Sequence, residues 1–360
     1  MGKIEEEKTR KLMKQLERVE LNKPLAKYTT LRIGGPAQFF YEAKTVDELI
    51  KSVNLARDLG IKVTILGGGS NVLISDKGIK GLVVRNCTKN IKILEKIKEY
   101  CDYTFPESES ESRWKPVKAK GGKVSLDDLD YDERGKPRVG VVLDSGVPLP
   151  FAIEFLIKNQ ITGLQWFTGI PGTIGGAVYN NIHGGKHFFS EVVKSVEILG
   201  LNGKVATLES KDLEFGYNKS RFHYSKEVIL RVELSLYKGD VERAKYVCEK
   251  IKGIKKDLPL NSAGCVFSNI TEGEAKRLGV PTQSTGYLIE NVLKLTGFKI
   301  GDAAISKIHH NFIVNQGHAT ARQFLGVMKK IYVEAQKVGI KLKPEIVLLG
   351  FSKDEIIEFL

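Results

Sequence analysis

The sequence predicts an α+β fold of two or three domains, and three observations support this class. At 360 residues the chain is long enough for more than one sizeable core. A strand predicted over 61–66 runs into the loop GGGSN, but the β-branched, apolar segment 71–74 favours a further strand instead of a helix. This order disfavours a Rossmann fold, in which the glycine loop opens a helix. The C-terminal third mixes short strands and helices, as expected of a compact α+β unit.

The hydrophobic pattern predicts each element in order. An amphipathic helix is expected over 3–19, with its apolar residues on one face, and a second helix begins at Val46 and ends at Gly60. Further helices are expected at 149–158, 241–256, 285–295 and 321–338. Strands are expected at 61–66, 81–84, 139–143, 193–199, 228–236, 312–314 and 346–349.

Residues 86–137 differ from their surroundings. The run 107–112 alternates Glu and Ser, and Gly, Lys and Asp dominate nearby. Such low-complexity composition is typical of a segment that cannot bury enough apolar surface to fold alone. We therefore predict an exposed, partly disordered insertion over 86–137.

Charge and hydropathy restrict the function classes. The formal net charge of +13 suggests nucleic acid as a partner, but Lys and Arg are interleaved with Glu and no nucleic-acid-binding motif occurs. We expect a solvated basic surface, part of which lines a pocket for polyphosphate ligands. No apolar run approaches the roughly 20 residues that span a bilayer, and the first residues lack the apolar core of a signal peptide. We expect a cytoplasmic protein with no membrane partner.

The four cysteines are far apart in sequence, and no CxxC pair occurs: Cys87, Cys101, Cys248 and Cys265. This spacing indicates neither a zinc site nor a disulfide framework.

Two glycine-rich segments about a hundred residues apart indicate a ligand. They are ILGGGSNVLI at 65–74 and GIPGTIGGAV at 169–178. Glycine lets a backbone N–H approach a diphosphate closely and adopts positive φ at little cost. Two different segments of this kind predict a large anionic cofactor held from two sides.

Together with YTTLRIGGPA at 28–37 and NSAGCVFSN at 261–269, these segments resemble the UDP-N-acetylenolpyruvoylglucosamine reductase family, in the subgroup without an extra tyrosine loop. The resemblance spans about residues 20–350. It implies an FAD-binding domain of the vanillyl-alcohol-oxidase (PCMH) type at 23–238, after an N-terminal helix at 1–22. A smaller α+β substrate-binding domain follows at 239–360. It also implies FAD as cofactor, NADPH as reductant, a UDP-sugar as substrate, and a monomer that binds no nucleic acid.

The resemblance also implies cofactor contacts. The first segment would present backbone N–H groups to the FAD diphosphate, through Gly67, Gly68, Gly69, Ser70 and Asn71. The second would line the other side of the flavin, through Gly172, Thr173, Gly175, Gly176 and Ala177. Arg32 is expected to pair with a phosphate.

Three catalytic positions follow from the same resemblance. Cys265 matches the serine that gives a proton to the substrate, and a thiol is the better acid of the two. Glu345 matches a second catalytic carboxylate. Asn218 stands where the family has an arginine, so we expect Lys219 or Arg221 to supply the missing charge.

Three residues are expected to contact the substrate: Asn269, Lys256 and Tyr217. Ser268 replaces a customary lysine, while Asp302 and Asn311 replace customary glycines. His309 and His310 are expected to be structural.

Three alternatives remain open at this point. The chain could be a different flavin-dependent oxidoreductase on the same fold, a flavin-binding protein without turnover, or a nucleic-acid binder driven by charge. The yellow colour of bound flavin would separate the flavoprotein hypotheses from the nucleic-acid binder. Turnover of the UDP-enolpyruvyl sugar would separate the reductase hypothesis from all three alternatives.

Overall fold

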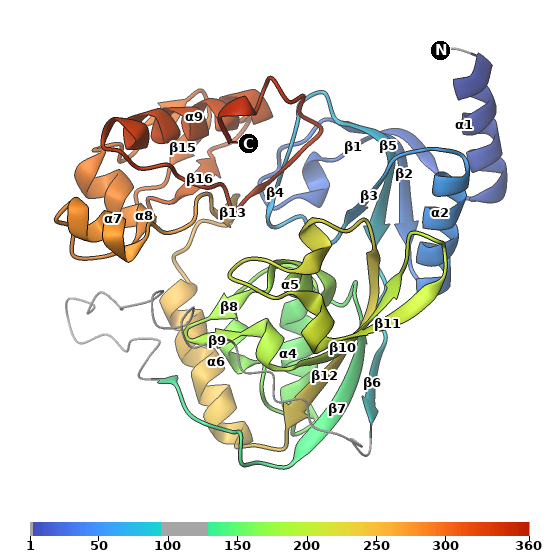
Figure 1. The fold of residues 1–360 in the computed structure, drawn as a ribbon, viewed down its shortest axis with the longest axis horizontal. Coiled ribbons are helices and arrows are strands. Elements are labelled where there is room, and N and C mark those ends of the chain that lie inside the picture. The colour runs from blue at the N-terminus through green and yellow to red at the C-terminus, as the bar shows by residue number, and fades with distance from the viewer. Residues whose placement is uncertain (1–2, 95–128, 360) are drawn as a thin grey trace.

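The structure is a computed structural model that describes residues 3–94 and 129–359 (Figure 1). Its first sheet has the order β1 (Glu20–Pro24), β2 (Pro36–Ala43), β5 (Ile79–Asn86) and β3 (Val63–Leu66). The last three strands are parallel, and β1 pairs antiparallel with β2. Helices α1 (Lys3–Gln15) and α2 (Val46–Asp58) contribute Leu12, Leu49 and Val53 to the same core as this sheet. Helix α1 ends at Gln15, so it is shorter than the predicted 3–19.

A five-stranded antiparallel sheet forms the second layer. Its order is β11 (Val205–Glu209), β10 (Val193–Leu199), β12 (Val228–Tyr237), β7 (Arg138–Asp144) and β6 (Ile91–Leu94). Helices α4 (Leu149–Lys158) and α5 (Ile174–Asn180) bury their apolar faces in the core of this sheet. The small hairpin β8 (His183–Gly184) and β9 (His187–Phe188) follows α5.

The C-terminal part has its own antiparallel sheet, β13 (Ser262–Cys265), β16 (Phe312–Asn315), β15 (Ala303–Ile305) and β14 (Lys299–Ile300). Helices α7 (Glu272–Arg277) and α9 (Ala321–Lys337) join its core. The predicted helix 285–295 is a short turn, α8 (Thr285–Tyr287), continued by a π-helical turn at Leu288–Val292. The last strand, β17 (Val347–Leu349), leaves this unit and pairs parallel with β4 (Val72–Ile74), directly after the first glycine loop.

Two boundaries differ from the sequence prediction. Residues 91–94 form strand β6, and Leu129 and Glu133 are buried, so both described ends of the predicted 86–137 insertion belong to the folded protein. Its centre, 95–128, lies outside the described residues, and so does Cys101. Helix α6 (Val241–Lys255) buries Val247 and Ile251 beside Trp166, so it packs on the second layer although the sequence placed it in the C-terminal domain.

Within the described ranges, no helix is both long and apolar enough to cross a membrane. No group of three or more metal-ligating side chains is assembled in that part of the chain either.

Candidate active site

A cavity of about 690 Å³ opens where the two glycine segments meet the C-terminal sheet. Its size falls in the range of about 300–1,000 Å³ that is usual for ligand and cofactor sites. Strand ends bring residues from distant parts of the chain to its wall, including Cys265 at the end of β13 and Glu345 before β17. The lining contains every predicted cofactor residue except Arg32: Gly67, Gly68, Gly69, Ser70, Asn71, Gly172, Thr173, Gly175, Gly176 and Ala177.

The two glycine segments touch, so they form adjoining parts of one wall. A Cβ on Gly68 would lie 2.8 Å from the Cα of Gly172, and one on Gly67 would lie 2.8 Å from Oγ1 of Thr173. Ser70 Oγ also donates a hydrogen bond of 3.1 Å to the carbonyl of Pro171. Only residues without a side chain allow this approach, which leaves backbone facing the cavity. The wall therefore fits the diphosphate and ring system of a flavin dinucleotide.

The second segment contains helix α5, which the sequence did not predict because two glycines lie inside it. Thr173 caps the helix by accepting a hydrogen bond from the N–H of Gly176. A Cβ on Gly175 would lie 2.8 Å from the Cβ of Ser145, after strand β7. Close packing against the sheet thus stabilises a helix whose intrinsic propensity is poor.

The TTLR motif joins the first glycine loop to the C-terminal sheet. The Thr30 N–H donates to Gly69 O at 3.0 Å, and its hydroxyl donates to Ser262 O at 2.6 Å. Arg32 instead has a positive φ of 56°, is exposed, and does not line the cavity. The motif therefore brackets two parts of the site, and the expected phosphate contact of Arg32 has no support in this structure.

Glu345 and Asn218 meet at the cavity wall. Asn218 Nδ2 donates a hydrogen bond of 2.5 Å to Glu345 Oε1. Asn218 lies at φ 48° in a tight turn closed by Gly216 and Lys219, a conformation that Asn tolerates better than most residues. Asn181, at the end of α5, holds this turn by donating to Gly216 O at 3.0 Å.

The environment of Glu345 favours its neutral form. Burial raises its pKa to about 7, although hydrogen bonds from Ser268 and Asn218 oppose the shift. Its backbone is fixed because its N–H donates to Val266 O at 2.8 Å and its carbonyl accepts from Asn71 Nδ2 at 3.1 Å. Glu345 is thus a rigidly held carboxyl group that carries a proton on a large fraction of molecules at neutral pH.

Cys265 is the last residue of β13, and the next residue, Val266, accepts the hydrogen bond from the N–H of Glu345. Burial and the charge of Glu345 raise the pKa of the thiol to about 12, despite a hydrogen bond with Asn311. The side chain lines the cavity and keeps its proton throughout the physiological range. Asn311, found at a customary glycine, also clamps Phe267 through hydrogen bonds to both of its backbone polar groups.

Neither residue expected to replace the missing arginine reaches Asn218. Arg221 pairs with Glu227 through Nε at 3.0 Å and Nη2 at 3.1 Å, and donates to Asp212 O. The Lys219 ammonium lies over the ring of Tyr224. Neither side chain lines the cavity, so this structure gives no support to the prediction that one of them supplies the charge.

None of the three predicted substrate residues lines the cavity. Lys256 is exposed, whereas the preceding Lys255 donates from Nζ to Thr168 O at 2.7 Å beside Gly169. Asn269 Oδ1 accepts from the N–H of Thr285 at 3.2 Å. Tyr217 packs its ring on His183, with centroids 5.2 Å apart.

Sequence reasoning missed Lys255 and His183. Burial lowers the pKa of Lys255 to about 8, and no ion pair of this lysine with an acidic side chain occurs in the ranges 3–94 and 129–359. Helical phase was the available signal, because consecutive residues of α6 point about 100° apart and only one of the two lysines faces the glycine segment. His183 lines the cavity, and no pattern in the sequence marked it.

Comparisons with known proteins agree with this geometry. Residues 37–102 and 123–209 match the family model of an FAD binding domain, and residues 255–349 match that of the C-terminal domain of UDP-N-acetylenolpyruvoylglucosamine reductase. UDP-N-acetylenolpyruvoylglucosamine reductase 1 of Bacillus anthracis is 32% identical, over 92% of this chain and 95% of its own. The reductase of Caldanaerobacter subterraneus subsp. tengcongensis is 28% identical, over 97% and 99%.

A solved structure shows the same fold. The crystal structure of the reductase from Thermus caldophilus superposes with a TM-score of 0.64 at 27% identity, covering 92% of this chain and 98% of that one. The α+β class, with an FAD-binding domain followed by a C-terminal domain, is confirmed. The chain belongs to the UDP-N-acetylenolpyruvoylglucosamine reductase family.

Proposed function

We propose that this protein reduces UDP-N-acetyl-3-O-(1-carboxyvinyl)-glucosamine to UDP-N-acetylmuramate, a peptidoglycan precursor, through bound FAD and with NADPH as reductant. One observation carries the proposal beyond family membership. The cavity lined by the two glycine segments also contains Cys265, Glu345 and Asn218, so a proton donor and a carboxyl group face the place that fits a flavin.

FAD, when bound, supplies a hydride acceptor for NADPH and a hydride donor for the enolpyruvyl ether. The backbone of Gly67–Asn71 and Gly172–Ala177 would hold it, because the close contact of Gly67 and Gly68 with the second segment leaves no space for side chains at these two glycines. The cavity-lining residues Leu149, Ile170 and Ala177 would provide apolar surface for its rings.

Cys265 and Glu345 handle the charge that hydride addition creates on the substrate. Addition at the terminal vinyl carbon leaves an electron pair on the adjacent carbon, delocalised into the carboxylate. The Cys265 thiol gives its proton to that carbon, and solvent returns a proton to sulfur. Glu345 in its neutral form donates a hydrogen bond to the carboxylate oxygen, in a site where Asn218 brings no positive charge.

Lys255 is our candidate for attracting the substrate diphosphate. It is a half-buried cation beside Gly169, and no ion pair with an acid occupies it in the described part of the chain. Tyr217 and Asn269 remain proposed substrate-binding residues. Tyr217 packs on His183, which lines the cavity, and Asn269 accepts a hydrogen bond from the N–H of Thr285. We also propose that the enzyme works as a cytoplasmic monomer.

The test is NADPH oxidation by the purified yellow holoenzyme, with and without the UDP-enolpyruvyl sugar. We expect oxidation that depends on the sugar and yields UDP-N-acetylmuramate. Cys265→Ser retains a proton donor and should keep measurable turnover, whereas Cys265→Ala should lose about 10²- to 10⁴-fold in kcat.

Flavin absorbance of both variants provides the control, since neither change removes a backbone contact of the glycine segments. A colourless protein, or NADPH oxidation indifferent to the sugar, would exclude the proposed reaction. Equal kcat for the serine and alanine variants would exclude Cys265 as the proton donor while leaving the reaction itself standing.

A further inference from the structure

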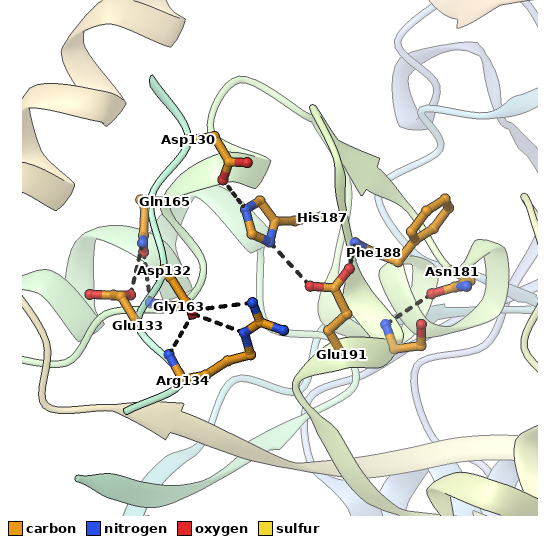
Figure 2. Close-up of polar contacts among 11 residues, drawn as sticks. Asp130, Asp132, Glu133, Arg134, Gly163, Gln165, Asn181, His187, Phe188 and Glu191 are labelled. Atoms are coloured by element: carbon orange, nitrogen blue, oxygen red, sulfur yellow. Dashed lines mark hydrogen bonds and ion pairs between the residues drawn. The ribbon is translucent and has the colours of Figure 1, made fainter. Parts of the chain in front are cut away.

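A second cluster of ionisable residues lies away from Cys265 and Glu345, around His187 on strand β9 (Figure 2). His187 Nε2 lies 2.7 Å from Asp130 Oδ1, and Nδ1 lies 3.1 Å from Glu191 Oε2. Ionised carboxylates only accept hydrogen bonds, so both ring nitrogens must donate. A neutral imidazole has one N–H, and the arrangement is therefore complete only when the ring is an imidazolium.

The ring is also stacked. Its centroid lies 3.8 Å from that of Trp166 with an interplanar angle of 25°. A cation over the indole face gains from the ring quadrupole. Glu191 is fixed in turn, because its Oε1 accepts from the Phe188 N–H at 2.7 Å. His187 thus joins Asp130, Glu191 and Trp166, which come from three different segments.

Residues 129–137 also contact the turn 162–168, which contains Trp166, through a second residue, Glu133. Glu133 is only 4% exposed, and it accepts hydrogen bonds from Thr162 Oγ1 at 2.7 Å and Gln165 Nε2 at 3.1 Å. Gln165 Oε1 accepts from the Gly163 N–H at 2.6 Å (Figure 2). The turn 162–168 is therefore held by side chains far away in sequence.

This turn and the β8–β9 hairpin both lead to the cavity. Thr168 is followed directly by the second glycine segment, and His183 on β8 lines the cavity wall. The hairpin lies tightly on the turn, because a Cβ on Gly184 would come within 2.2 Å of the Trp166 carbonyl oxygen. Gly184 is the cross-strand partner of His187. A shift of the histidine would thus move both supports of the cavity.

We propose that protonated His187 is a positioning residue for the FAD site, which fixes the 162–168 turn and the β8–β9 hairpin by holding Asp130 and Glu191 against Trp166. It contacts no predicted cofactor residue itself. Its effect passes through Trp166 to Gly169–Gly172 and through Gly184 to His183.

The charges around the ring set the pH range. Asp130 and Glu191 face it directly, Asp132 acts on it from further away, and Lys186 lies on the side of Asp130. Burial opposes the charged ring, but the two carboxylates prevail and raise the pKa of His187 from 6.5 to about 9. A raised folded-state pKa gives stability that is fully present below about 6.5 and lost as pH rises through about 9.

The experiment follows FAD release from the holoenzyme by the increase in flavin fluorescence between pH 6 and pH 10. We expect the release rate of the wild type to rise roughly five- to tenfold, with a midpoint near pH 9. His187→Gln should release FAD faster at pH 7 and lose this step. His318→Gln, at an exposed histidine, should behave as the wild type.

Lys255 titrates near pH 8 on the other side of the same turn, so the difference between wild type and His187→Gln isolates the histidine. Asp130→Asn should lower the midpoint, because it removes one of the two carboxylates. Nitrogen NMR of the wild-type ring should show two N–H groups at pH 7. One N–H at pH 7, or FAD release unaltered by both His187→Gln and pH, would overturn the proposal whatever the reaction catalysed.

Discussion

Asn218 Nδ2 donates a hydrogen bond of 2.5 Å to Oε1 of Glu345, across 127 residues of sequence. The amide N–H stabilises the ionised carboxylate, whereas burial favours the protonated form and prevails. Asparagine at this position therefore orients the carboxyl group but does not keep it ionised. A cation in contact with the carboxyl group would keep it ionised.

The first prediction concerns the pH dependence of turnover. With its pKa raised to about 7, Glu345 loses its proton as pH increases through neutrality, so kcat at saturating substrate should fall over that range. Asn218→Ala removes a donor that favours the carboxylate and should move the midpoint to higher pH. The same change should lower the maximal kcat about tenfold, because the carboxyl group loses its orientation.

Ser268→Ala serves as the matched variant, since Ser268 also hydrogen-bonds Glu345 and lowers its pKa. Both variants should shift the midpoint in the same direction. If steady-state kinetics give an unchanged midpoint for both variants, Glu345 does not determine the pH dependence of kcat.

The second prediction concerns stability. A carboxyl group whose pKa rises from 4.5 to about 7 on folding binds more protons in the native state between these values, so stability falls as pH rises through that range. Glu345→Gln keeps the shape and removes the titration. The variant should be more stable than the wild type at pH 8, by at most about 3 kcal/mol, and the difference should shrink towards pH 4.

Urea unfolding of the holoproteins at the two pH values measures this difference. Glu154→Gln is the control, because Glu154 pairs with Lys158 on the exposed face of α4 and should have an effect within about 0.5 kcal/mol. A stability difference independent of pH would contradict burial as the cause of the raised pKa.

The third prediction concerns thiol reactivity. The thiolate is the reactive form, and a pKa of about 12 leaves roughly one thiolate in ten thousand thiols at pH 8. Cys265 should therefore resist alkylation by iodoacetamide in the folded protein, as followed by mass spectrometry. Glu345→Gln removes a negative charge that raises the pKa of the thiol and should accelerate the labelling of Cys265.

Two features of the site could be predicted from the sequence because local motifs encode them. Glycines at 67–69 and 172 were predicted to line one cofactor site, and the structure places them in contact there because each loop lacks side chains at the same point. The resemblance implied catalytic roles for both Cys265 and Glu345, and the pairing of Glu345 N–H with Val266 O brings the two residues together.

Other features depend on tertiary contacts that no local pattern carries. Arg221 is occupied by Glu227, and this pairing depends on how the 3-10 turn at Arg221–His223 orients the side chain. Helix α5 forms despite its glycines because Ser145 packs closely on it. The His187 cluster was not predicted, since Asp130 lies 57 residues away and follows a low-complexity segment.

The fourth prediction tests the glycine wall. Gly69 has a φ of 63°, and a Cβ there would lie 2.0 Å from the Tyr28 carbonyl oxygen. Gly69→Ala should displace the 28–33 segment and lower the FAD content of the purified protein, read from its visible absorbance. Gly253→Ala, in helix α6, where no atom of another described segment lies within 4 Å of the added Cβ, should keep the flavin and gain about 0.5–1 kcal/mol of stability.

The fifth prediction concerns Asp76, which joins the loop between β4 and β5 to helix α9 of the C-terminal part. It lies between β4 and β5, and its two carboxylate oxygens accept from the N–H groups of Ala321 at 2.7 Å and Arg322 at 2.9 Å, in the first turn of α9. These N–H groups have no partner inside the helix, and the negative charge also complements the helix dipole. Asp76→Ala should therefore cost about 1–2 kcal/mol in the free energy of unfolding by urea.

Asp76→Asn separates the two contributions, because an amide keeps one acceptor oxygen and loses the charge. It should fall between the wild type and the alanine variant. Asp47→Ala, at an exposed first-turn residue of α2 whose side chain bridges no two parts of the chain within residues 3–94 and 129–359, should cost less than Asp76→Ala. Equal costs for the two alanine variants would mean that Asp76 acts only through the dipole of α9 and does not hold α9 against the β4–β5 loop.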